Sequence, residues 1–131
     1  MYILTLRTDK PEAEIGLYED NEKVDYLKWH AHRELSDTLL SNINNMLIEN
    51  KLDLDKIEGI IIYSGPGSFT GLRIGFAVAK TLAYGLDCKI VSATSEGWIA
   101  IGTNSLRSGE LNTKLVLPVY GADVHITQPK K

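Results

Sequence analysis

Cysteine, long apolar runs and an excess of basic charge are all scarce or missing in this sequence. Its 131 residues include one cysteine, Cys88, which excludes an internal disulfide framework and suits a reducing cytoplasm. No apolar stretch approaches the ~20 residues needed to cross a bilayer, and residues 1–6 lack the basic start of a signal peptide. We therefore expect a cytoplasmic protein that has no membrane partner.

The charges are nearly balanced and scattered along the chain. The sequence has 14 Lys and Arg against 17 Asp and Glu, for a formal net charge of -3, and its one basic cluster is the tail at residues 130–131. A nucleic-acid-binding domain typically carries a basic patch beside aromatic side chains that stack on bases. Trp29 and Trp98 lie far apart in the sequence, so we expect no direct binding of RNA by the chain alone.

Hydrophobic periodicity predicts a mixed α/β fold. Three β-prone segments joined by short polar turns come first, which favours an antiparallel meander. Helical and strand periods then alternate, so we expect helices packed on a mixed sheet in the order βββαβαβα, followed by a short C-terminal hairpin. The predicted strands are residues 2–7, 13–19, 23–30, 60–63 and 89–92; the predicted helices are residues 34–50, 71–86 and 96–102 with Ser95 as N-cap; residues 103–112 are predicted as a polar loop and residues 114–127 as the hairpin.

A glycine-rich loop joins the buried strand at residues 60–63 to the second predicted helix. It lacks the lysine of a P-loop, and its glycines miss by one residue the spacing of a dinucleotide fingerprint. Two interpretations stay open: the loop holds an anion at the helix N-terminus, or its glycines serve only the packing of a tight turn. The residues of this signature loop are Gly65, Pro66, Gly67, Ser68, Phe69, Thr70 and Gly71, with Arg73 following in the helix.

No residue pattern in the sequence predicts catalysis or a metal site. Ser68 and Thr70 lie in no nucleophile-elbow motif and have no histidine at a motif-defined position, so we expect one of them to cap the second helix. His30 and His32 would share one face of a strand, but a zinc site needs further ligands and none stands at a recognised spacing. We therefore expect no catalytic residue, no metal and no cofactor.

The string from Gly65 to Gly75 is far more specific than a generic glycine loop, and it resembles the signature of the TsaB/YeaZ family. The resemblance continues in register through residues 3–8 and 76–86, and it covers nearly the whole chain. It implies an actin/Hsp70-like (ribonuclease H-like) half-domain. Residues 1–112 would form its N-terminal lobe, and residues 113–131 would be the start of a second lobe.

Members of the TsaB/YeaZ family are understood to be non-catalytic scaffolds. They bind TsaD, the subunit that transfers a threonylcarbamoyl group to the adenosine beside the anticodon of certain tRNAs, and they work with the ATPase TsaE. The resemblance therefore implies a TsaD-like catalytic subunit as partner, a TsaE-like ATPase as a further partner, and contact with tRNA only through the partner. Pairing in the family uses two helices, which correspond here to residues 34–50 and 71–86.

The second predicted helix also favours a docking role by its composition, because it is apolar on nearly all sides. Gly75, Ala79 and Ala83 recur every four residues, so another helix could approach closely along this stripe. The alternative is that the first helix covers the stripe from within the chain. Without a partner, the same surface should pair two copies of the chain. The expected interface residues are Leu39, Ile43, Met46, Leu72, Gly75, Phe76, Ala79, Lys80 and Ala83.

One departure from actin-like ATPases argues against metal-assisted phosphate chemistry. Those enzymes carry an acidic residue at the end of the first strand, where this chain has Arg7, and a guanidinium cannot ligate a cation. Two other functions stay open beside the scaffold. One is a single-lobe nucleotide- or anion-binding module that uses residues 64–71, and the other is a purely structural dimer with no role in tRNA modification.

Overall fold

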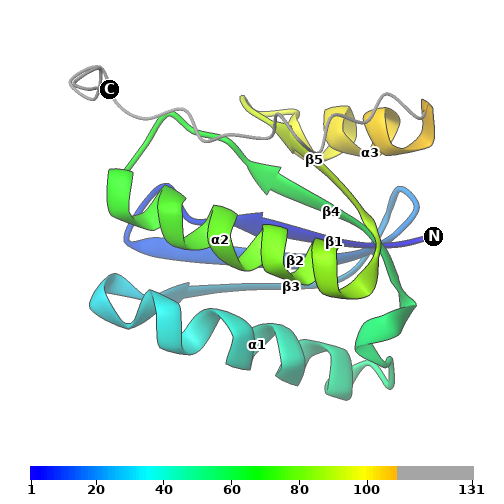
Figure 1. Ribbon diagram of the computed structural model, residues 1–131, viewed down its shortest axis with the longest axis horizontal. Helices are drawn as coiled ribbons and strands as arrows, with labels where there is room; N and C mark the ends of the chain where they lie inside the picture. The colour runs from blue at the N-terminus through cyan, green and yellow to red at the C-terminus, as the bar shows by residue number, and fades with distance from the viewer. Residues whose placement is uncertain (109–131) are drawn as a thin grey trace.

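The computed structural model describes residues 1–108 and builds them around one five-stranded sheet. The strands lie in the order β3-β2-β1-β4-β5, with β1 in the middle (Figure 1). Helices α1 and α2 lie side by side on one face of the sheet, and α3 covers part of the other face. The elements are β1 (Tyr2–Arg7), β2 (Glu12–Glu19), β3 (Glu22–His30), α1 (Leu35–Glu49), β4 (Ile57–Tyr63), α2 (Phe69–Leu86), β5 (Lys89–Ala93) and α3 (Trp98–Ser108), with short 3₁₀ turns at His32–Glu34 and Leu54–Lys56.

The sheet is mixed because the connections between its strands differ in length. Short turns join β1, β2 and β3, which run antiparallel, so that Leu4 lies opposite Leu17 and Ile15 lies opposite Leu27. A helix precedes each of β4 and β5; β4 runs parallel to β1, and β5 runs parallel to β4. The mixed α/β class and the element order predicted from the sequence are therefore confirmed for the described residues.

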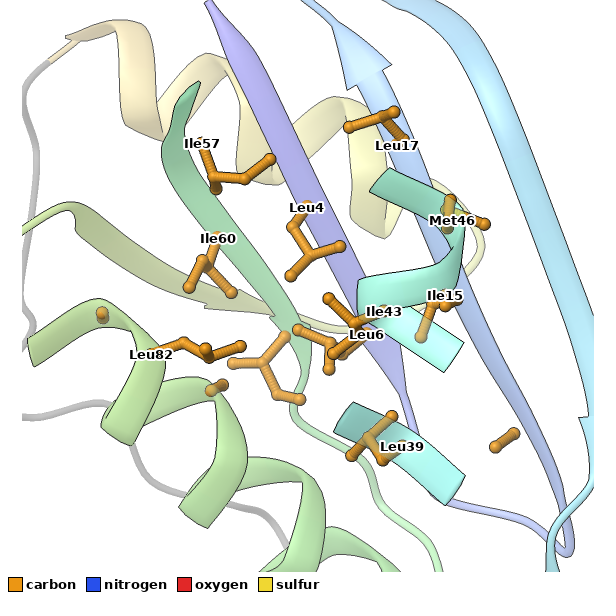
Figure 2. Close-up of a cluster of buried hydrophobic side chains, with 14 of the residues drawn as sticks. Leu4, Leu6, Ile15, Leu17, Leu39, Ile43, Met46, Ile57, Ile60 and Leu82 are labelled. Atoms are coloured by element: carbon orange, nitrogen blue, oxygen red, sulfur yellow. The ribbon is translucent and has the colours of Figure 1, made fainter. Parts of the chain in front are cut away.

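The larger of two hydrophobic cores lies between the sheet and the helices α1 and α2. Alternation along the strands points Leu4 and Leu6 of β1 and Ile15 and Leu17 of β2 to this face (Figure 2). Each such side chain contributes roughly 1.5–3 kcal/mol when it is fully buried, so this layer fixes both helices on the sheet. The helical side chains that complete the layer are Leu35, Leu39, Ile43, Met46 and Leu47 of α1 and Phe76, Ala79, Leu82 and Ala83 of α2.

The smaller core lies on the opposite face, where α3 covers β4 and β5. Trp98 and Leu106 of α3 are both buried there. Leu106 lies over Gly59, and Gly102 leaves room for Ile61, whose side chain would be 2.5 Å from a Cβ atom at position 102. Close approach of α3 to the sheet therefore depends on two positions that have no side chain.

Several predicted element boundaries are wrong, including the start of the strand predicted at residues 60–63, which begins at Ile57. Residues 103–112 are predicted as a polar loop, but α3 continues to Ser108 because Thr103 and Leu106 are buried against the sheet. The second helix is predicted from residue 71, but α2 begins at Phe69, within the glycine-rich loop. Packing on the sheet decides where α3 ends, whereas the first residues of α2 are exposed and its start follows from the Ser68 cap.

Ser95 is predicted as the N-cap of the third helix, but that helix begins at Trp98. Ser95 instead has a φ of 75°, and its carbonyl oxygen accepts the Trp98 N–H at 3.2 Å. It therefore belongs to the turn that leads into α3. The predicted hairpin at residues 114–127, and the predicted second-lobe start at residues 113–131, lie outside the described residues.

Candidate functional site

The signature loop leaves the carboxyl end of β4 and packs against the end of β1. A Cβ atom at position 67 would lie 2.4 Å from the Cβ atom of Asp9, and one at position 71 would lie 2.2 Å from the Thr8 carbonyl oxygen. At position 75, one turn further along α2, a Cβ atom would lie 2.1 Å from the Thr8 Oγ1 atom. The three glycines are therefore needed because backbone and side-chain atoms of Thr8 and Asp9 lie directly against them.

Hydrogen bonds within the chain occupy several polar groups of the loop. The Ser68 N–H donates to the Asp9 carbonyl oxygen at 2.9 Å, and the Ser68 Oγ atom accepts the Gly71 N–H at 3.3 Å. The Thr94 hydroxyl donates to the Gly65 carbonyl oxygen. Ser68 is thus the N-cap of α2, as the sequence predicts for it or Thr70. These bonds favour the packing interpretation of the loop over the anion-binding one.

Arg7 lies at the end of β1, where actin-like ATPases carry an acid, and it is held by its own chain. Its Nε atom is 2.8 Å from Asp9 Oδ1 and its Nη2 atom is 3.3 Å from Asp9 Oδ2, a two-pronged ion pair. The guanidinium also lies over the Tyr63 ring, 4.0 Å from the ring centroid. Burial alone lowers the pKa of Arg7, but the hydrogen bond and charge of Asp9 outweigh it, so the pKa is raised.

Sequence reasoning missed Asp9, which it assigned to a polar turn. The Asp9 carboxylate is nearly buried, and the residue contacts both Arg7 and the loop at Gly67. Nothing in the local sequence separates this aspartate from an exposed turn residue. A buried carboxylate needs a partner, and the arginine two residues earlier was the available signal.

The predicted interface residues are mostly buried inside this chain. Gly75 faces Thr8, Ala79 has no exposed surface, and Ala83 is 6% exposed. The stripe of small residues thus faces the sheet, and the expectation that it lies on the outer side of α2 is wrong. Lys80 is half-buried and Leu72 is fully buried, and the remaining predicted interface residues belong to the larger core: Leu39, Ile43, Met46 and Phe76.

Other residues of the same two helices form an exposed surface, which we call the outer helix face. It comprises Leu40, Asn44 and Ile48 of α1 and Ala77, Thr81 and Tyr84 of α2. Large apolar side chains are unusually open there, with Leu40 48% exposed, Ile48 63% and Tyr84 91%. A hollow of about 340 Å³ between the helices is lined by Leu40, Ser41, Ile43, Asn44, Leu54 and Leu82.

Within residues 1–108, no three side chains of His, Cys, Asp or Glu come together as a metal site would require. His30 lies at the exposed end of β3. Cys88 is half-buried, and burial raises the pKa of its thiol, which lowers its reactivity at neutral pH. The same part of the chain contains no helix with the length and apolar character needed to span a membrane.

Comparisons with known proteins point to one family. The family model described as "TsaD: tRNA N6-adenosine threonylcarbamoyltransferase" matches residues 29–110. Two relatives are named tRNA threonylcarbamoyladenosine biosynthesis protein TsaB. The Bacillus subtilis protein is 31% identical over 93% of this chain and 51% of its own length, and the Haemophilus influenzae protein is 30% identical over 68% of this chain and 37% of its own length.

A solved structure, YeaZ from Pseudomonas aeruginosa, has the same fold, with a TM-score of 0.68 at 23% identity over 83% of this chain and 50% of that one. Together with the match to the TsaD family, this likeness supports the actin/Hsp70-like fold that the resemblance implies. The chain spans about half the length, or less, of these curated relatives. Because the family model covers more than half of the chain and the relatives bear the TsaB name, this chain belongs to the TsaD protein family, in its TsaB/YeaZ branch, and corresponds to the first lobe of that branch.

Proposed function

We propose that this chain is the first lobe of a TsaB-like subunit that binds a TsaD-type threonylcarbamoyltransferase. In that role it supports threonylcarbamoyl modification of tRNA without catalysing it. The names of the relatives support the pathway. The observation that carries the docking role is the outer helix face, where apolar side chains stand open on two adjacent helices.

The end of β1 supports a non-catalytic role. Phosphate chemistry of the actin-like kind needs a carboxylate there that can hold a metal ion. Arg7 occupies that place, and its ion pair with Asp9 directs the nearby carboxylate inward instead of towards a ligand. In the loop that could bind a phosphate, the Ser68 and Gly71 N–H groups donate hydrogen bonds to oxygen atoms of the chain itself.

The partner helices would lie across the groove between α1 and α2. Ala77 and Thr81 are small and exposed, so a helix can approach α2 closely at these positions. The hollow beside Leu40 would take an apolar side chain of the partner. When the partner is absent, we expect the same face to pair two copies of this chain. A TsaE-like ATPase stays a prediction of the family resemblance.

Ala77→Glu tests the docking role. The exposed carboxylate should leave the isolated fold within about 0.5 kcal/mol of its normal stability, because surface substitutions rarely cost more. It should abolish co-purification with a TsaD-type partner, since a partner helix would bury the charge without a counter-ion. Ala100→Glu places the same change on the exposed side of α3 and serves as the matched control. Undiminished co-purification of folded Ala77→Glu protein would exclude this face.

Ala79→Glu cannot serve for that test. Ala79 has no exposed surface, so the glutamate would be buried in the core. We expect this variant to lose at least ~3 kcal/mol of stability and to unfold at low denaturant. If the Ala79→Glu protein is folded and fails to bind the partner, the small-residue stripe would belong to the interface after all.

Mass spectrometry of tRNA nucleosides tests the pathway. Cells depleted of the protein should lose threonylcarbamoyladenosine, and expression of the wild-type chain should restore it better than Ala77→Glu does. An unchanged nucleoside profile after depletion would favour the purely structural dimer. Sedimentation of wild-type and Ala77→Glu protein then shows whether the outer helix face also pairs two copies.

A further inference from the structure

Three hollows meet at Thr70, at the end of the molecule where α2 begins. The largest, of about 570 Å³, runs along the end of β3 and the turn before α1. One of about 190 Å³ lies between the β1–β2 turn and the start of α2, and one of about 260 Å³ follows the first turns of α2. The three hollows share Thr70, and two of them share Ala31 or Ile74, so we name them together the Thr70 groove. Its lining residues are Lys10, Pro11, His30, Ala31, Arg33, Glu34, Leu35, Ser68, Thr70, Gly71, Arg73, Ile74 and Ala77.

Cationic side chains from three separate segments line the Thr70 groove. Lys10, Arg33 and Arg73 are exposed, and none forms a salt bridge with a residue of the described part of the chain. Glu34 is the one carboxylate residue in the lining. The whole chain carries a net charge of -3, so this local excess of positive charge runs against its average.

The groove is also partly apolar. The half-buried Ile74 lines it at the start of α2, and Pro11 and Ala77 add exposed apolar surface, whereas Leu35 and Ala31 of the lining are nearly buried. The Ser68 and Gly71 N–H groups are bonded within the chain, so the positive charge described here comes from side chains. An occupant must therefore bring both negative charge and apolar side chains.

We propose that the Thr70 groove binds an acidic, extended peptide segment of another protein. Carboxylates spaced along such a segment can meet Arg33, Lys10 and Arg73 in turn, while apolar side chains between them rest on Pro11, Ile74 and Ala77. RNA phosphates match the cations but not the apolar surface, and the net charge of the chain repels them at longer range. The two surfaces share Ala77, but the cations that carry this proposal lie outside the outer helix face.

Fluorescence anisotropy with three labelled probes tests the proposal on the full chain. The probes are a short peptide that repeats Glu-Leu-Asp-Gly, the same peptide with lysine at each acidic position, and an oligouridine RNA of similar length. We expect the acidic peptide to bind, the basic peptide not to bind, and the affinity for the acidic peptide to fall with added salt.

Charge reversal locates the binding. Exposed ion pairs are individually weak, but Arg33→Glu combined with Arg73→Glu turns two attractions into two repulsions and should weaken binding of the acidic peptide about tenfold. Lys56→Glu removes an exposed cation outside the groove and should leave binding unchanged. Equal binding of the two peptides, no effect of the double reversal in folded protein, or stronger binding of the RNA than of the acidic peptide would each overturn the proposal.

Discussion

At the scale of single residues, Thr8 and Asp9 explain why the signature loop contains so much glycine. The loop and the start of α2 approach these two residues so closely that Gly67, Gly71 and Gly75 have no space for a side chain. A composition that suggests a phosphate loop therefore serves contact between backbone segments. The sequence shows the glycines but not the surface that they meet.

Alanine at two glycines of α2 should act in opposite directions. Gly75→Ala forces a methyl group against Thr8 and should destabilise the protein by about 1–3 kcal/mol. Gly85 has open space around it within the same helix, so Gly85→Ala should stabilise by about 0.5–1 kcal/mol. Urea unfolding monitored by circular dichroism measures both. Equal effects of the two changes would contradict the steric explanation.

Tyr26 should make the stability depend on alkaline pH. Its hydroxyl donates to the buried Glu14 carboxylate at 2.6 Å, and burial together with that charge raises the pKa of Tyr26 far above its ordinary value of about 10. Above pH 10 the unfolded chain releases this proton and the folded chain keeps it, so stability falls as the pH rises. Unfolding between pH 9 and about 11 should show a steeper decline for wild type than for Tyr26→Phe. Parallel declines would exclude the effect.

At the scale of elements, α2 shows how an apolar helix can be covered by its own domain. Its stripe from Gly75 through Ala79 to Ala83 faces the sheet, and its flank at Ile74 and Leu82 faces α1. Small residues mark close packing on the strands as well as close packing between helices. The composition alone could not distinguish packing on strands from packing between helices. The surface available for docking is therefore the outer helix face and not the predicted stripe.

The cap of α2 contributes to stability at this scale. Ser68→Ala removes the oxygen that accepts the Gly71 N–H and should cost about 1 kcal/mol. Ser41→Ala, at an exposed position within α1, should instead stabilise slightly because alanine favours helices. Thermal unfolding of the two variants measures the difference. Equal midpoint temperatures would show that Ser68 does not stabilise α2 as its cap.

At the scale of the whole molecule, the position of α3 limits where the chain can continue. The helix α2 connects β4 to β5 on one face of the sheet, and α3 lies on the other face. Crossovers between parallel strands are right-handed, so a helix on the other face would have to return the chain towards β4, where the place is occupied. The start of a second lobe at residues 113–131 stays a prediction of the family resemblance.

We expect residues 1–112 to fold without the residues that follow. All the described side chains of the two hydrophobic cores lie within residues 1–108, so removal of residues 113–131 leaves these side chains in place. Calorimetry should show one cooperative transition with the same midpoint for the shortened and the full chain. Loss of cooperativity in the shortened chain would show that the later residues belong to this lobe.

The sequence by itself determined the class of fold, the order of the elements and the family, because these depend on local periodicity and on one specific string from Gly65 to Gly75. Only the tertiary structure decided which side of α2 is buried, where α3 ends, and that Asp9 is paired inside the protein with Arg7. Periodicity identifies an apolar stripe but not the surface that covers it. That surface comes from strands and turns far away in the sequence, and it exists only once the sheet has formed.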